Sequence, residues 1–247
     1  MSNTNKTKTL AVPEFSLLEK ALAWSVHFLT ASGVMAAFMS IVTVSQHQFR
    51  EAMLWLFLAF IIDGIDGSFA RRWRVKEILP SFSGKNMDYV IDFATYAIIP
   101  AYFVYEAQLV PSFLNIFTVA AILYTSVFYY GKLGMVSDDL HFIGFPVLWN
   151  FVVFYLFFVW DLGEISNFII IILLCILHFV PIKFLYPSQT QAHFGLTLSI
   201  TIIAVISSIA LLYIFPENNL ILSIAASIGV VYFFAMTIYK TYFYKKN

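Results

Sequence analysis

The 247-residue chain has little charge and almost no cysteine, and each shortage excludes a class of protein. Charged residues make up 11% of the sequence, against about 25% in a typical soluble domain. Hydrophobic residues make up 61%, so neither a water-soluble fold nor a disordered chain fits. The one cysteine, Cys175, cannot form a disulfide within the chain, which excludes a secreted disulfide scaffold.

The chain also lacks an excess of positive charge. Its 14 Lys and Arg residues balance 14 Asp and Glu residues, which gives a formal net charge of zero. A nucleic-acid-binding protein needs a basic surface, so we expect no nucleic-acid partner. The 10 glycines likewise exclude a collagen-like repeat.

Long charge-free runs are the main feature that is present. A helix needs roughly 20 apolar residues to cross a bilayer, and two runs, 52–62 and 93–105, reach that length only with their flanking aspartates included. The sequence therefore predicts an all-α, multi-pass membrane bundle of about eight helices. We place them at 25–45, 51–72, 87–107, 113–130, 146–161, 165–182, 193–213 and 219–240.

The basic residues predict the orientation of this bundle. Arg50 is the one Lys or Arg that falls on the face opposite the chain ends, and the other 13 fall on the face with the ends. By the positive-inside rule, both termini face the cytoplasm. We divide the chain into a cytoplasmic segment, 1–24, and one membrane domain, 25–247. Within the segment, residues 14–24 form either a short interfacial helix or a lead-in to the first span.

Four aspartates lie where the second and third spans approach the cytoplasm: Asp63, Asp66, Asp88 and Asp92. Aspartates within a span are costly, at about 2.5–3.5 kcal/mol near its centre. The spacings i,i+3 and i,i+4 put each pair on one helix face. Because clustered carboxylates repel one another, we expect Mg²⁺ or Mn²⁺ among them. The alternative is that they cap helix ends or pair with Arg71, Arg72 and Lys85.

Small residues accompany the acids. Gly64 and Gly67 lie within the second span, and each costs about 1 kcal/mol relative to alanine. For Gly67 we favour close approach of a ligand to the backbone. For Gly64 we favour close packing of helices.

The motif Asp63-x2-Asp66-Gly67-x2-Ala70-Arg71, followed by Gly84-x3-Asp88-x3-Asp92, resembles the signature of the CDP-alcohol phosphatidyltransferases. The loop between Arg71 and Gly84 is longer than is usual in this family. That loop resembles the bacterial phosphatidylcholine synthases within the family, as do the segments 27–33, 144–150 and 181–187.

This resemblance implies a reaction and assigns roles to the motif. The implied reaction is metal-dependent transfer of the phosphatidyl group from CDP-diacylglycerol to choline, with release of CMP. Asp63, Asp66 and Asp88 would hold metal, and Asp92 would bind a second ion and act as the base. The nucleotide and its phosphates would meet Asp63, Gly67, Ala70, Arg71 and Gly84. The arginine can also be read as a purely topological residue.

Choline carries a fixed positive charge, so its pocket should offer aromatic faces and perhaps one acid. Our candidates are Tyr96, Trp149, Asp139 and Asn150. Core packing is the alternative for Tyr96, and a place in the interfacial aromatic belt is the alternative for Trp149.

Other functions stay open at this stage. The acceptor could instead be serine, inositol or glycerol phosphate, although a phosphorylated acceptor should require more basic residues near the fifth and sixth spans. A cation transporter is a further alternative, but its acids should lie near the membrane midplane. We expect the protein in the inner membrane of a bacterium, with its active site at the cytoplasmic face and homodimer assembly left open.

Overall fold

The computed structural model describes residues 15–137, 141–185 and 194–243, and these are almost entirely helical. Helices and strands follow one another as α1 (Leu17–Ser45), α2 (Phe49–Arg72), α3 (Val75–Ile78), α4 (Gly84–Phe93), η1 (Ala94–Ile98), α5 (Ile99–Glu106), α6 (Ser112–Tyr130), β1 (His141–Ile143), α7 (Trp149–Phe154), η2 (Tyr155–Val159), α8 (Glu164–Leu177), β2 (Lys183–Leu185), α9 (Phe194–Ile214), α10 (Leu220–Ile238) and η3 (Tyr239–Phe243). The three η segments are π-helical turns.

Six of these helices are long and apolar enough to cross a membrane. One of them runs without a break from Gly84 to Glu106 through α4, η1 and α5. Large apolar side chains cover the outside of the bundle; Phe113, Tyr213 and Ile221 are 81%, 84% and 77% exposed. Such a surface needs lipid around it. The prediction of an all-α, multi-pass membrane bundle is confirmed.

The predicted fifth and sixth spans are shorter in the structure than in the prediction. The helices found there are 149–159 and Glu164–Leu177, about 16 and 21 Å long at 1.5 Å per residue. The second ends early because the loop before α7 caps it: the Phe145 N–H donates to the Leu177 carbonyl at 2.9 Å. Pro181 then disfavours continuation of the helix.

The start of α1 decides between the two readings of the N-terminal segment. Ser16 and Glu19 form a capping box, in which the Glu19 N–H donates to Ser16 Oγ at 3.2 Å and Ser16 N–H donates to Glu19 at 2.8 Å. From Leu17 the helix continues without interruption to Ser45. The described part of the segment is therefore a lead-in to the first span and not a separate helix.

A small sheet joins two loops that lie far apart in the sequence. Strands β1 and β2 pair antiparallel, with Phe142 opposite Phe184. Neither strand was predicted, since each has three residues inside a loop between apolar helices. The sheet ties the segment before α7 to the segment after α8.

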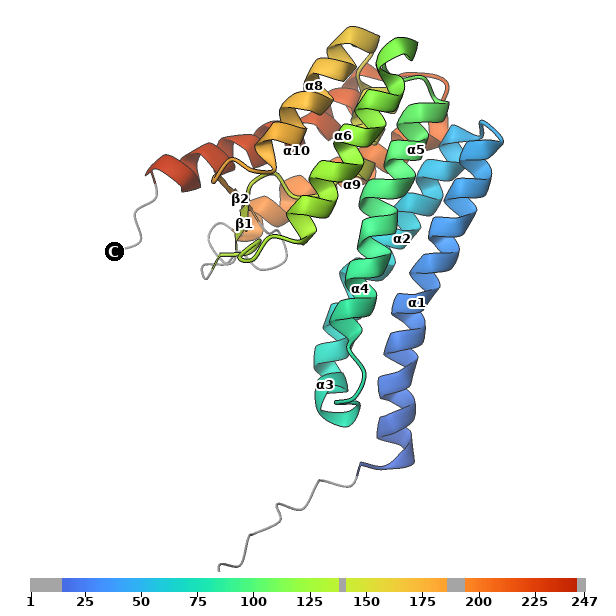
Figure 1. Cartoon of the computed structure of the whole chain (residues 1–247), viewed down its shortest axis with the longest axis vertical. Helices are drawn as coiled ribbons and strands as arrows, with labels where there is room; N and C mark the ends of the chain where they lie inside the picture. The colour runs from blue at the N-terminus through green and yellow to red at the C-terminus, as the bar shows by residue number, and fades with distance from the viewer. Residues whose placement is uncertain (1–14, 138–140, 186–193, 244–247) are drawn as a thin grey trace, which may run out of the picture.

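Helices α1, α2 and α4 extend together beyond the rest of the molecule, towards the end that holds α3 (Figure 1). The short turn between α1 and α2 makes them antiparallel neighbours. Glycines let α4 approach α1 closely, because a Cβ at Gly33 would lie 3.3 Å from Ile91 and a Cβ at Gly84 would lie 3.1 Å from His27. Helix α1 thereby packs against both α2 and α4, and the segments of α2 and α4 that carry the aspartates line one cavity.

Candidate functional site

Helices α2 and α4 bring three of the four aspartates together. One carboxylate oxygen each from Asp63, Asp88 and Asp92 can be chosen so that all lie within 4.8 Å of one another. Asp63 comes from the second half of α2, and the other two occupy successive turns of α4. The predicted convergence of two helix faces is therefore what the fold produces, and three carboxylates at this spacing can hold a metal ion.

Asp66 lies in the wall of the same cavity. This cavity, which we call the acid cavity, has a volume of about 10 Å³ and is lined by all four aspartates together with Thr30, Gly33, Ala59, Ile62, Ile91 and Thr95. The Asp66 side chain is 7% exposed, and its Oδ2 accepts a hydrogen bond from the Thr30 hydroxyl at 2.6 Å. Asp66 is thus oriented by α1, although it stands outside the group of three closest carboxylates.

No cationic side chain balances these acids within the described part of the chain. Ion pairs there join Arg50 to Glu51 and Arg74 to Glu77, and neither involves the acid cavity. Arg71 donates to the Ser68 hydroxyl at 3.2 Å, and Lys85 lies over the ring of Tyr89. The alternative that the acids are there to pair with these basic residues is therefore wrong.

A cluster of partly buried carboxylates without counter-charge is unfavourable unless a cation enters it. All the charged ligands are carboxylate oxygens, which suit a hard divalent cation better than zinc. The donor set therefore fits a divalent metal ion.

The π-helical turn η1 places Tyr96 against the acids. After Phe93, one residue beyond Asp92, the span changes from α-helix to π-helix, and the Thr95 hydroxyl donates back to the Ile91 carbonyl at 3.0 Å. The Tyr96 hydroxyl donates to Asp63 Oδ2 at 2.9 Å, which links α2 to the third span. Single π-turns of this kind are common at functional sites. Among the described choline candidates, Tyr96 is the one with a hydrogen bond to the acid cluster.

The small residues of the motif have different surroundings. A Cβ at Gly67 would lie 3.5 Å from Arg71 Nη1, so the guanidinium lies over this glycine. Ala70 packs against the small apolar cluster between α1 and α3. A Cβ at Gly64 would have no atom within 4 Å, so the helix packing that we expected for Gly64 does not occur within the described residues.

None of the described choline candidates lines the acid cavity, and unlike Tyr96, neither Trp149 nor Asn150 has a hydrogen bond to its acids. Trp149 is 0% exposed and donates to the Ser126 hydroxyl at 2.9 Å, so it is not an interfacial-belt residue. Asn150 is also buried, and its Oδ1 accepts from the Phe151 N–H at 2.9 Å. The remaining candidate, Asp139, lies outside the described residues.

Three residues of the site were not predicted individually: Thr30 on Asp66, Thr95 in the cavity wall and His27 against Gly84. Two of them stand in the segment 27–33, which we had identified only as a family resemblance. Their positions on the face of α1 that meets α2 and α4 depend on helix packing.

Comparison with known proteins gives one consistent result. No family model matches the chain. A phosphatidylcholine synthase of Rhizobium meliloti is 41% identical over 181 residues, covering 73% of this chain and 75% of the relative. One of Pseudomonas aeruginosa is 39% identical and covers 77% and 80%. One of Brucella melitensis is 37% identical over 229 residues and covers 93% and 80%.

Proposed function

Because the chain belongs to the phosphatidylcholine synthase family, we propose that it transfers the phosphatidyl group of CDP-diacylglycerol to choline and releases CMP. The observation that carries this proposal is the acid cavity, in which four carboxylates from two neighbouring membrane helices line one small space. Family membership supports a lipid substrate and a membrane enzyme, and the cavity supplies a place for the chemistry.

The reaction is energetically favourable, so the main task of the protein is to align the reacting groups. It exchanges a phosphoanhydride for a phosphoester, which is downhill. The choline oxygen attacks the phosphorus of the phosphatidyl group while the bond to CMP breaks on the opposite side. The protein must hold these groups in line and exclude water from the phosphorus.

Asp63, Asp66, Asp88 and Asp92 are the residues that would hold divalent cations, which we propose to be two Mg²⁺ or Mn²⁺ ions. Bound there, such ions would offset the charge of the diphosphate and stabilise the departing CMP. The hydrogen bonds from Thr30 to Asp66 and from Tyr96 to Asp63 would hold two of the carboxylates in place.

Asp92 is the base in this proposal. It would accept the proton of the choline hydroxyl as the new phosphorus–oxygen bond forms, since an alcohol is too weak an acid to lose that proton beforehand. Arg71 would bind a phosphate oxygen with its planar guanidinium. Gly67 and Ala70 would leave room beside α2 for the cytidine, and Gly84 keeps α4 close to α1.

For choline itself we propose Tyr96 as the first contact, because its hydroxyl donates to Asp63 and it follows Asp92 by one helical turn in the sequence. Asp139, Trp149 and Asn150 stay predictions for the same pocket. We further propose that the protein lies in the inner membrane with both termini and the acid cavity on the cytoplasmic side, as the positive-inside rule indicates. A homodimer stays open as its assembly.

The test is CMP release by the purified full-length protein in detergent with CDP-diacylglycerol, labelled choline and Mn²⁺ or Mg²⁺. We expect release that requires both the metal and choline, with label transferred to the lipid. Equal release with serine, inositol or glycerol phosphate in place of choline would assign a different acceptor. Release that persists in excess chelator would contradict the metal-dependent mechanism.

A further inference from the structure

The larger of the two cavities that we describe lies at the other end of the bundle from the acid cavity. Its volume is about 270 Å³. It is bounded by turns between helices: Gln108 and Leu109 after α5, residues 160–163 before α8, and Asn218 before α10. Glu106, the last residue of α5, lies about 21 Å along the helix from Asp92, so the two cavities are well separated. We call this second space the turn cavity.

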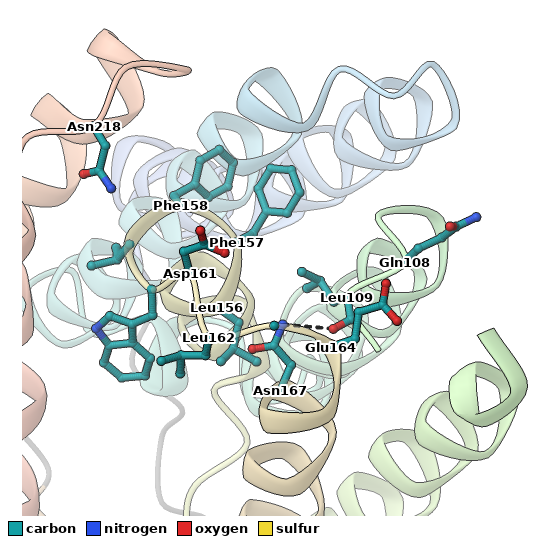
Figure 2. A pocket seen from close by; sticks show the side chains of 13 residues that line it. Gln108, Leu109, Leu156, Phe157, Phe158, Asp161, Leu162, Glu164, Asn167 and Asn218 are labelled. Carbon is teal, nitrogen blue, oxygen red and sulfur yellow. Dashed lines mark hydrogen bonds between the residues drawn. The ribbon is translucent and has the colours of Figure 1, made fainter. Parts of the chain in front are cut away.

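The wall of the turn cavity offers negative and aromatic groups. Figure 2 shows the carboxylates of Asp161 and Glu164 at the cavity, with the rings of Phe157 and Phe158 nearby, and Trp160 also lines it. Its described lining contains no Lys, Arg or His, and no described basic group lies within 4.0 Å of either carboxylate. These groups suit a cation that also has apolar surface.

A buried amide gives an independent sign of a ligand. Asn167 is 5% exposed, and its Nδ2 donates to the Leu109 carbonyl at 2.9 Å. Figure 2 shows this bond as a dashed line, with Oδ1 turned away from it. This Oδ1 has no hydrogen-bond partner among the described residues. A buried acceptor without a donor is costly, at about 1–3 kcal/mol, and a ligand donor in the cavity would remove that cost.

Asp161 is stronger evidence for a bound cation than Glu164 is. Glu164 lies in the first turn of α8, where the helix dipole alone favours an acidic residue. Asp161 lies outside any helix and is exposed, so the dipole does not explain it. Asp161, the Asn167 acceptor and the rings together are what point to a ligand.

The excess of acidic residues at this end of the bundle also favours a positively charged ligand. The described charged residues at or near its turns are Arg50, Glu51, Glu106, Asp161, Glu164 and Glu217. The one cation among them is already paired with Glu51 at 2.9 Å. The local field therefore attracts cations and repels anions.

We infer that the turn cavity binds a small organic ammonium group that also carries a hydrogen-bond donor, either as a free ion or as a lipid headgroup. The ammonium group would lie between the carboxylates and the aromatic rings, while a hydroxyl or N–H would donate to Asn167 Oδ1. At about 270 Å³ the cavity is slightly smaller than the usual pocket for a drug-sized ligand, which fits a headgroup-sized ligand. This inference does not rest on the proposed function, because it concerns a second site far from the acids.

The experiment uses full-length protein carrying Asp63→Asn, kept in a chelator so that the acid cavity holds no metal. Labelled choline is titrated onto this protein in nanodiscs of phosphatidylglycerol, whose headgroup has no ammonium. A parallel titration uses a water-soluble short-chain phosphatidylethanolamine, whose ammonium group carries N–H donors, as the headgroup probe. Each is repeated with Asp161→Asn and Glu164→Gln added, and with Glu217→Gln added as the matched control at the same end. Size-exclusion profiles and melting curves check that each variant is folded.

We expect saturable binding of at least one probe. The Asp161→Asn, Glu164→Gln variant should weaken it about tenfold, which corresponds to about 1.4 kcal/mol, and Glu217→Gln should change it less than about twofold. Binding of choline alone would identify a free ion, and binding of the lipid alone a headgroup. Tetramethylammonium, which has no donor, should bind more weakly than choline. The inference would be overturned if neither probe bound, or if the Asp161→Asn, Glu164→Gln variant bound the probes as tightly as the protein without these two changes.

Discussion

The acid cavity and the turn cavity both present carboxylates, but the chain builds them from different parts of the fold. In the acid cavity the carboxylates come from two helices, at spacings that put each pair on one face. In the turn cavity the polar groups come from three turns and from the first turn of α8, and the lining runs over more than a hundred residues of sequence, from Gln108 to Asn218. Charges fixed on rigid helices can bind a metal ion with defined geometry, whereas turns give a wider and more adaptable space.

The surroundings of the carboxylates differ as well. Asp66 and Asp63 each accept a hydrogen bond from a side chain of another helix, at 2.6 and 2.9 Å. Asp161 and Glu164 are exposed. Oriented carboxylates in a space of about 10 Å³ favour a small, highly charged ion, while exposed ones around about 270 Å³ favour a larger, singly charged ligand.

The largest expected effect tests whether the acid cavity alone carries the chemistry. Asp92→Asn should lower turnover about a thousandfold, because the amide cannot accept the choline proton. Nucleotide binding should be largely retained, since three carboxylates remain. CMP release and the binding of a CDP-diacylglycerol analogue give the two measurements. Glu106→Gln, at the other end of the same span, is the control, and unchanged turnover in Asp92→Asn would remove this residue as the base.

A second effect separates metal binding from catalysis. Asp63→Asn should weaken Mn²⁺ binding about a hundredfold, because it removes a charged ligand and leaves Tyr96 without its carboxylate acceptor. Titration calorimetry measures the binding, and activity at rising Mn²⁺ concentration should recover in part. In titrations of the protein with Ca²⁺ and Mn²⁺, the turn cavity should not provide a metal site of comparable affinity. Equal Mn²⁺ affinity in the variant and the parent would contradict the ligand assignment.

The acid cavity could be predicted from the sequence and the turn cavity could not, for a physical reason. Helical periodicity fixes which residues share a face, so Asp63 and Asp66, and Asp88 and Asp92, could be paired without a structure. The apolar helices were likewise predicted, because the length of an apolar run is a local property, although six of those in the described chain are long enough to cross a membrane and the predicted fifth and sixth spans are shorter. Groups brought together by turns depend on how whole helices pack.

Other features of the fold could not be predicted from the sequence for the same reason. The early end of α8 depends on a backbone hydrogen bond from Phe145, and the β1–β2 pair depends on the meeting of two loops. Thr30 could be seen as part of a family-like segment, but its bond to Asp66 depends on the α1–α2 contact. Gly64 was assigned to packing on composition alone, and no described atom lies close enough to support that.

A smaller effect tests the support that α1 gives to the acid cavity. Thr30→Val keeps the shape of the side chain but removes the donor to Asp66, so metal affinity and activity should fall about tenfold. Thr30→Ser keeps the hydroxyl and should stay within about threefold of the parent. Thr118→Val, on α6, is the control for loss of a buried threonine hydroxyl elsewhere. An equal loss in Thr30→Val and Thr118→Val would mean that the effect is general instability.

The smallest effects compare glycines at the two cavities. Gly84→Ala should lower stability by about 1 kcal/mol, because its Cβ would lie 3.1 Å from the His27 ring. Gly163→Ala, in the wall of the turn cavity, should cost a similar amount for another reason, since this glycine has φ +77° and no described atom within 4 Å of a Cβ. Adding His27→Ala should recover part of the first loss and none of the second, as measured by melting curves in a double-mutant cycle. No recovery at Gly84 would show that the acid-cavity end is not set by close contact between α1 and α4, and recovery at Gly163 would show that the effect of His27→Ala is not specific to that contact.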